Sequence, residues 1–239
     1  AKPDGYTFVI VSNTTMAANP SMFHKLPYDA VKDFAPVALL GRTSMMYVVR
    51  TDFPADSLEA LVAEAKRRKV PLNAGYGSST AQVALNMLTT ATGMEVTRVP
   101  YPGTPKLTVD LLGGQVDFAV VDVGAGVVQQ RAGRVRPLAI AASRKLETAG
   151  NVSMLTDRYP GVFMDTWIAI AAPAGTPAAI IQKVNAAVNA AARRPDVRHA
   201  FQTVAIDLVT STPQELDAII KADQQKWPRL IRDAGIQPE

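Results

Sequence analysis

Short apolar segments of strand length alternate with helix-like segments along the middle of this chain. Strands are predicted near residues 70–74, 95–99 and 115–121, and each is followed by a turn and by an apolar stripe of helical period. A strand that leads through a helix to a second strand of the same sheet pairs with it in parallel. The pattern therefore predicts an α/β fold with helices on both faces of a parallel sheet.

The glycine-rich turn at 73–80 is the clearest candidate for ligand binding. Gly75 and Gly77 allow positive φ and a close approach of the backbone. Three hydroxyl residues follow where helix N-caps belong: Ser78, Ser79 and Thr80. The next helix is predicted to end at Gly93, and its positive end suits a carboxylate or phosphate. The same residues also suit an ordinary capped helix.

Further polar turns follow other predicted strands, at Ser12–Thr15, Tyr101–Thr104 and Asp122–Gly126. Ligands of open parallel sheets bind beyond the carboxyl ends of the strands, so these turns and 75–80 are expected to line one cleft. Asp122 is expected either to accept a hydrogen bond from a ligand ammonium or hydroxyl group or to cap the following helix. Trp167 and Tyr101 are expected to wall the cleft or to pack as core aromatics, and Trp227 to pack.

The composition limits the compartment and the partners of the chain. Its 239 residues are 48% hydrophobic, and no apolar run is long enough to cross a bilayer, so we expect a globular protein without membrane insertion. The net charge of +4 comes without a basic surface interleaved with aromatic residues, so no nucleic-acid partner is expected. The absence of cysteine excludes disulfides and fits both the cytosol and the periplasm.

Residues for catalysis and metal binding are scarce. The two histidines, His24 and His199, do not lie near a strand-end motif where they would activate a serine. The 75–79 turn lacks the spacing of a nucleophile elbow. No metal-ligand spacing, Walker motif or complete dinucleotide fingerprint is present. We therefore expect no enzyme, no cofactor and no metal site.

Outside the middle segment, strands are predicted at 7–11, 34–41, 45–50, 163–172 and 204–209. Thr176 is predicted as the N-cap of a helix that starts at Pro177. Thr212 and Glu215 form a capping box that opens a long helix, which is expected to end at Gly235.

A series of short motifs follows the order that is typical of one receptor family: Pro3-Asp4-Gly5-Tyr6-Thr7, Asn19-Pro20, Leu26-Pro27-Tyr28-Asp29, Lys32-Asp33-Phe34-Ala35-Pro36-Val37, Val99-Pro100-Tyr101, Leu111-Leu112-Gly113-Gly114-Gln115-Val116, Ala172-Pro173-Ala174-Gly175-Thr176-Pro177 and Ala234-Gly235-Ile236. From end to end the chain resembles the substrate-binding receptors of tripartite tricarboxylate transporters, also called the Bordetella uptake gene family.

The resemblance implies a type II periplasmic binding protein fold, in which two α/β lobes are joined by two crossing strands and the ligand binds in the interlobe cleft. Residues 1–51 and 166–239 are expected to form lobe 1, and residues 52–165 lobe 2. The expected function is that of a periplasmic receptor that captures a small carboxylate and delivers it to membrane transporter subunits. The family's contacts to the carboxylate map onto Asn13, Thr14, Ser78, Ser79, Thr80, Tyr101 and Asp122.

Two features depart from the family pattern. Members often carry a histidine where this chain has Ala81 and an asparagine where it has Val123, so a less polar cleft or a different ligand is expected. Members usually begin with a βαβ segment ahead of the Pro-Asp-Gly-Tyr-Thr motif, which only Ala1 and Lys2 precede here. That missing segment is expected to supply a central strand of lobe 1.

Two other functions stay open at this point. An effector-binding domain of a transcriptional regulator has a similar two-lobe fold, and it is expected to carry an attached helix-turn-helix. A degenerate carboxylate-processing enzyme is expected to convert its ligand. The identity of the carboxylate is left open, because amides and waters recognise the carboxylate group and little else.

Overall fold

The computed structural model describes residues 1–238; Glu239, the last residue of the predicted lobe 1, lies outside the described residues. The chain divides into two compact units. The first consists of Ala1–Arg42, Thr166–Gln202 and the segment from Asp207 onward, and the second of Thr43–Asp165 and Thr203–Ile206. The chain therefore passes from one unit to the other at both ends of the short segment Thr203–Ile206 as well as near residues 42 and 165.

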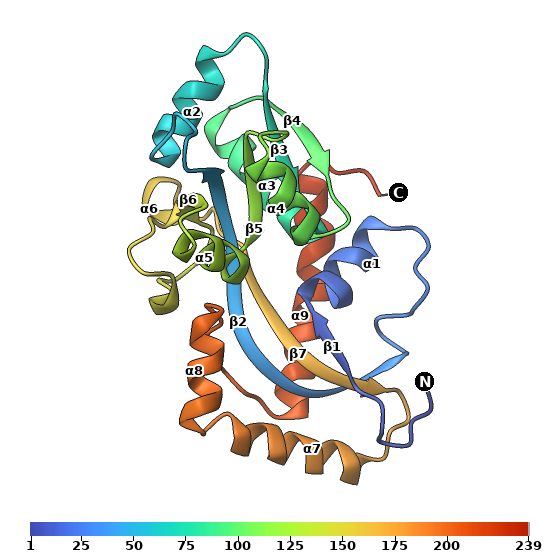
Figure 1. Ribbon diagram of the computed structural model, residues 1–239. Helices are drawn as coiled ribbons and strands as arrows, with labels where there is room; N and C mark the ends of the chain where they lie inside the picture. The colour runs from blue at the N-terminus through green and yellow to red at the C-terminus, as the bar shows by residue number, and fades with distance from the viewer. Residues whose placement is uncertain (239) are drawn as a thin grey trace. The chain divides into compact units, whose positions relative to one another are not determined.

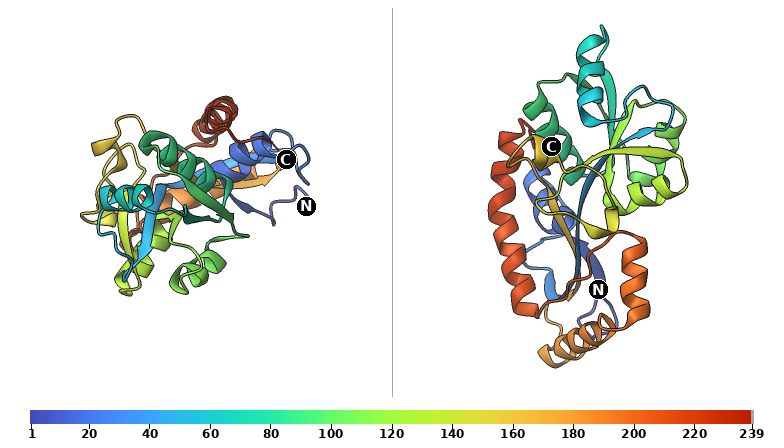
Figure 2. Two further views of the ribbon diagram at one scale, coloured as in Figure 1. Left: turned by 90° about the horizontal axis from the view of Figure 1, so that it is seen from above. Right: turned by 90° about the vertical axis from the view of Figure 1, so that its left-hand side faces the viewer.

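The first unit contains a sheet with strands in the order β1-β7-β2. Its strands are β1 (Val9–Ser12), β7 (Asp165–Pro173) and the first part of β2 (Phe34–Arg50). Two long helices accompany them: α7 (Ala178–Ala191) and α9 (Pro213–Asp233). Successive residues of a strand face opposite sides of the sheet. Accordingly, Ala171 shares a core cluster with Leu216 of α9, whereas Ala172 packs with Val184 of α7. Figure 2 shows α9 running beside these strands.

Short helices complete the first unit: the π-helix η1 (Thr14–Ala18), α1 (Asn19–Met22) and α8 (Pro195–Thr203). The predicted turn at 12–15 is therefore partly wrong, because a helix begins directly after Asn13. Its apolar residues explain the difference, since Met16 is 2% exposed. The Gln224 side chain of α9 donates to the Met16 carbonyl over 3.0 Å and fixes the short helix on α9.

The second unit contains a five-stranded sheet in the order β6-β2-β5-β3-β4 (Figure 1). Besides the second part of β2, its strands are β3 (Leu72–Tyr76), β4 (Val96–Pro100), β5 (Phe118–Asp122) and β6 (Val135–Ile140). Its helices are α2 (Leu58–Arg67), α3 (Ser79–Thr92), α4 (Thr104–Leu112), α5 (Val123–Arg131), η2 (Glu147–Ala149) and α6 (Leu155–Arg158). The predicted parallel pairing is confirmed for β3 with β4 and β5, whereas β2 pairs antiparallel with β5 and β6.

Helices pack on both faces of this sheet. Leu107 of α4 and Val127 of α5 share a core cluster with Met46 and Val121 of the strands. The Tyr47 side chain, which is next to Met46 and so faces the other side, donates from its hydroxyl to the Ala84 carbonyl of α3 over 2.8 Å. The strands are therefore buried on both sides, as the apolar runs of the sequence predict.

The structure joins the two strands predicted at 34–41 and 45–50 into the single strand β2. The residues between them stay extended although they are polar, because Ser44 is fully buried and donates from its hydroxyl to the Met164 carbonyl over 3.0 Å. A satisfied hydroxyl removes the main cost of burying a serine in a strand.

The strand predicted at 204–209 is wrong, because only Asp207 forms a bridge, to Arg42. Ala205 has a φ of 51°, which interrupts an extended run. It is fully buried in the core cluster of the second unit. Arg131 of α5 donates to the Thr203 carbonyl over 3.0 Å, so the segment is tied to α5 as well.

The other helix boundaries give a mixed result. The capping box at Thr212 and Glu215 is confirmed, and Gly235 follows the end of α9 with a φ of 67°. The predicted N-cap at Thr176 is wrong, because α7 starts at Ala178 and the Thr176 hydroxyl donates backward to the Pro173 carbonyl over 2.7 Å. Among residues 1–238, none of the helices combines the length and the hydropathy that a bilayer crossing requires.

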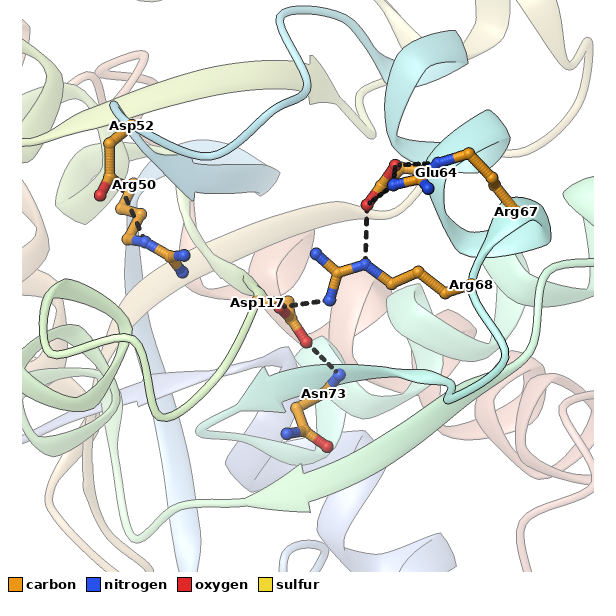
Figure 3. A network of polar contacts seen from close by, with 7 residues as sticks. All are labelled: Arg50, Asp52, Glu64, Arg67, Arg68, Asn73 and Asp117. Carbon is orange, nitrogen blue, oxygen red and sulfur yellow. Dashed lines mark hydrogen bonds and ion pairs between the residues drawn. The ribbon is translucent and has the colours of Figure 1, made fainter.

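A network of charged residues ties α2 to the beginning of β5 (Figure 3). The Glu64 carboxylate accepts hydrogen bonds from Arg67 over 2.8 Å and from Arg68 over 2.7 Å. Arg68 also reaches Asp117, whose other oxygen accepts from the Asn73 amide over 2.8 Å. The hydrogen bonds from Arg68 and Arg67 hold the pKa of Glu64 below its usual value.

Candidate ligand-binding site

Three of the four predicted turns lie at one edge of the second unit's sheet. Tyr76 of β3 is opposite Pro100 of β4 and Val120 of β5 in parallel pairing. Two residues further on, Ser78 and Asp122 therefore occupy equivalent positions at the carboxyl ends of neighbouring strands. Neighbouring strands are about 4.8 Å apart, so these turns form one continuous edge.

Glycines bring two of these turns into backbone contact. A Cβ on Gly77 would lie 2.8 Å from the Gly103 carbonyl carbon and 2.9 Å from the Thr104 nitrogen. A Cβ on Gly75 would overlap the Leu107 side chain of α4. The predicted close approach is confirmed, whereas neither Gly75 nor Gly77 uses the positive φ that glycine allows. Steric access, and not backbone handedness, requires glycine at both places.

The helix α3 begins at this edge, as the hydroxyl residues predict. Ser78 is its N-cap, and the Ser78 Oγ accepts a hydrogen bond from the Ala81 amide over 3.2 Å. The Ser78 hydroxyl can still donate its own proton to another group. Ser79 is partly exposed, whereas Thr80 is fully buried. The predicted end at Gly93 is confirmed, with a φ of 65°, so the helix runs over 14 residues and directs its positive end to the edge.

Tyr101 lies in the turn after β4 and is engaged at both ends. Its amide donates to the Tyr76 carbonyl over 2.9 Å, and its side chain packs against the core cluster. Desolvation and a hydrogen bond to the Asp110 carboxylate raise the pKa of Tyr101 above its usual value. Lys106 holds that carboxylate over 2.7 Å. The hydroxyl of Tyr101 is therefore oriented by α4.

Asp122 ends β5 and immediately precedes α5. Its backbone is opposite Met45 of β2, and its side chain is exposed. The predicted alternative of helix capping is wrong, because the Asp122 carboxylate makes no side-chain cap hydrogen bond to α5.

The remaining predicted site residues, Asn13 and Thr14, belong to the first unit. Asn13 is 2% exposed, and its side-chain oxygen accepts from the Trp167 amide over 3.4 Å. Trp167 is itself a core residue whose indole nitrogen donates to Asp223 over 2.7 Å. Trp227 is 1% exposed, so the expectation that it packs is confirmed.

Two residues that shape the edge were not singled out by the sequence pattern. Gly103 receives the backbone of the neighbouring turn, and Asp110 orients Tyr101. A glycine after each of two adjacent parallel strands is a signal for such a contact, whereas the pairing of Asp110 with Tyr101 depends on side-chain geometry. No group of three histidine, aspartate or glutamate residues in the described part of the chain is arranged to hold a metal ion.

Comparison with known proteins gives consistent results. Residues 1–236 match the family model described as the tripartite tricarboxylate transporter family receptor. The chain is 30% identical to protein BugT of Bordetella pertussis over 97% of this chain and 72% of BugT. It is 27% identical to an R. palustris protein solved with adipate, with a TM-score of 0.95 over 100% of this chain and 81% of that chain. For MatC from Rhodopseudomonas palustris with bound malate, the identity is 28% and the TM-score 0.85, over 97% and 81% of the two chains.

The family model covers almost the whole chain, and the similar proteins align with 97–100% of it. The chain belongs to the tripartite tricarboxylate transporter receptor family.

Proposed function

We propose that this protein is a periplasmic solute-binding receptor that captures a small carboxylate and delivers it, unchanged, to the membrane subunits of a tripartite tricarboxylate-type transporter. The observation that carries the proposal is the match of residues 1–236 to a transporter receptor family. Similar proteins solved with adipate and with malate support a carboxylate as the ligand. The same matches favour a receptor over the regulator considered from the sequence.

The polar edge of the second unit supports an anionic ligand. The positive end of the 14-residue helix α3 favours a negative charge at its first turn. The hydroxyl of Ser78 adds a donor at the same place. The contact between the turns at Gly77 and Gly103 keeps this edge rigid, and a rigid site loses less conformational entropy when it binds a ligand.

The proposed ligand contacts on the second unit are Ser78, Ser79, Thr80, Tyr101 and Asp122. Because Thr80 is fully buried, its proposed contribution is through the backbone. Asn13 and Thr14 are the proposed contacts on the first unit. These seven residues stay predictions until a complex is solved.

Native mass spectrometry of the full-length protein, purified from its source without denaturant, tests the proposal. We expect an additional mass that is released on unfolding and identified as a small carboxylate. If the protein is isolated empty, addition of adipate, malate and citrate in turn should give an adduct of one molecule with at least one of them. A chain that binds none of these acids, or that converts the acid it binds, would contradict the proposed function.

A further inference from the structure

Asp122 places a negative charge beside the proposed anion site. Ser78 and Asp122 are each two residues beyond the paired residues Tyr76 and Val120. The strands that carry them are about one strand spacing, roughly 5 Å, apart along the carboxyl edge of the sheet. A carboxylate bound at the beginning of α3 has the Asp122 side chain as an immediate neighbour.

The Asp122 carboxylate has no structural task that the described residues show. Aspartate at an N-cap normally accepts a hydrogen bond from the first turn of its helix, yet Asp122 makes no such bond to α5. Among the described residues, the one hydrogen bond recorded to this carboxylate comes from the backbone of Asp122 itself. Ser78, at the equivalent position of the neighbouring strand, does cap its helix, over 3.2 Å. The two strand ends thus differ, because the Ser78 side chain caps its helix and the Asp122 side chain does not.

Two carboxylates at this distance repel each other. At an effective dielectric constant of about 20, two unit charges roughly 5 Å apart lose on the order of a hundredfold in affinity. If the ligand carries a hydrogen-bond donor between its own carboxylate and that of Asp122, the donor bonds to Asp122 and the interaction becomes favourable. Hydrogen bonds to charged groups are stronger than those between neutral groups.

We infer that Asp122 determines ligand specificity by accepting a hydrogen bond from a donor on the ligand, so that the preferred ligand is a carboxylate with a hydroxyl or ammonium group next to the carboxylate bound at α3. This inference rests on the proposed function and adds a selection rule to it. The Asp122 carboxylate favours hydroxy or amino acids and disfavours plain acids of the same length, which place no donor between the two negative groups.

Matched pairs of ligands test the rule. Titration calorimetry on the full-length protein compares lactate with propionate and malate with succinate, which differ only by the hydroxyl group. We expect the hydroxy acid to bind about tenfold or more tightly in each pair that binds, which corresponds to one charge-assisted hydrogen bond. In Asp122→Ala that ratio should fall to about one. Asp122→Asn keeps an acceptor without the charge and should give an intermediate ratio.

Asp52→Ala is the matched control for loss of a carboxylate. Asp52 pairs with Arg50 over 2.8 Å (Figure 3), and Arg50 is five residues along β2 from Met45, which is opposite Asp122. That separation is about 17 Å, so Asp52→Ala should keep the wild-type ratio. Thermal unfolding of Asp122→Ala should match the wild type, since no cap is lost.

The outcomes separate the inference from the proposed function. A wild-type protein that binds carboxylates without preferring the hydroxy member overturns the inference and leaves the proposed function standing. The inference is also overturned if Asp122→Ala keeps the preference for the hydroxy acid, or if it weakens binding of both acids of a pair equally. Failure of the wild-type protein to bind any carboxylate contradicts both.

Discussion

The backbone of Gly77 lies directly against the backbone of Gly103, so that a Cβ on Gly77 would be 2.8 Å from the Gly103 carbonyl carbon. The contact joins the turn after β3 to the turn after β4, which are the two turns that lead into α3 and α4. The two glycines are not equally crowded, because a Cβ on Gly103 would meet only Pro105, at 3.7 Å. The two glycines therefore differ in what substitution does to them.

Gly77→Ala should destabilise the protein and weaken carboxylate binding. The added methyl group has to displace backbone atoms, and overpacking of this kind costs about 1–3 kcal/mol. Gly103→Ala adds the same methyl group where there is room and should stay close to wild type in both properties. Urea unfolding and calorimetry on both variants measure the difference, and equal effects of the two substitutions would contradict the contact.

Ser78 offers a way to separate the helix cap from ligand binding. Aspartate is as good an N-cap as serine and favours the positive helix end, so Ser78→Asp should keep or raise stability while abolishing carboxylate binding through charge repulsion. Ser78→Ala should lose about 0.5–2 kcal/mol of stability with the cap. Ser78→Asp that binds carboxylates as well as the wild type would place the anion site elsewhere.

Tyr47 ties β2 to α3, and its burial makes a prediction at alkaline pH. Tyr47→Phe removes the 2.8 Å hydrogen bond to the Ala84 carbonyl and should cost about 0.5–1.5 kcal/mol. Burial also raises the pKa of Tyr47 well above its usual 10.0. The pKa of Tyr47 is therefore higher in the folded than in the unfolded protein. The contribution of its protonated side chain to stability is complete below pH 10 and is lost as the pH rises through the folded pKa. Unfolding free energies measured from pH 8 upward should decline less steeply in Tyr47→Phe.

The Glu64 network predicts the opposite dependence at acidic pH. Hydrogen bonds from Arg68 and Arg67 lower the pKa of Glu64 from its usual 4.5. The ionised Glu64 side chain therefore contributes fully to stability above its unfolded pKa of 4.5. This contribution is lost as the pH falls through the lower pKa of the folded state. Glu64→Gln should unfold at a lower temperature at neutral pH and should approach the wild type in acid. Glu59→Gln, whose carboxylate is exposed and 4.0 Å from Arg158, serves as control and should behave as the wild type throughout.

Local signals in the sequence predicted the elements around the site well. The glycine and hydroxyl residues before α3 indicated a capped helix that ends at Gly93, and the structure has both. Parallel pairing of β3 with its neighbours follows from the alternation of strands and helices, which fixes handedness and direction. The close approach at Gly75 and Gly77 was also readable, because glycine is the residue that permits it.

Features that depend on distant partners were not predictable in this way. Ala205 looks like part of a strand, but burial in the core of the second unit holds it at a positive φ. The residues after Ser12 look like a polar turn, but Met16 is buried beside α9, more than 200 positions later in the chain. Asp122 was equally suited to capping a helix or to meeting a ligand, and only the geometry of its side chain separates the two.

The central claim is that this chain binds a small carboxylate and leaves it unchanged. Titration calorimetry of the full-length protein with adipate and malate, beside the uncharged diamide of adipate, tests it most directly. Three or four charge-assisted hydrogen bonds of roughly 1.5–3 kcal/mol each, less the cost of ordering, predict saturable binding of at least one of the two acids, with one molecule per chain, at about micromolar affinity or tighter. The diamide should not bind, and the acid should be recovered in full. Binding of the diamide as tightly as the acid, absence of binding by both acids, or appearance of a product would contradict the claim.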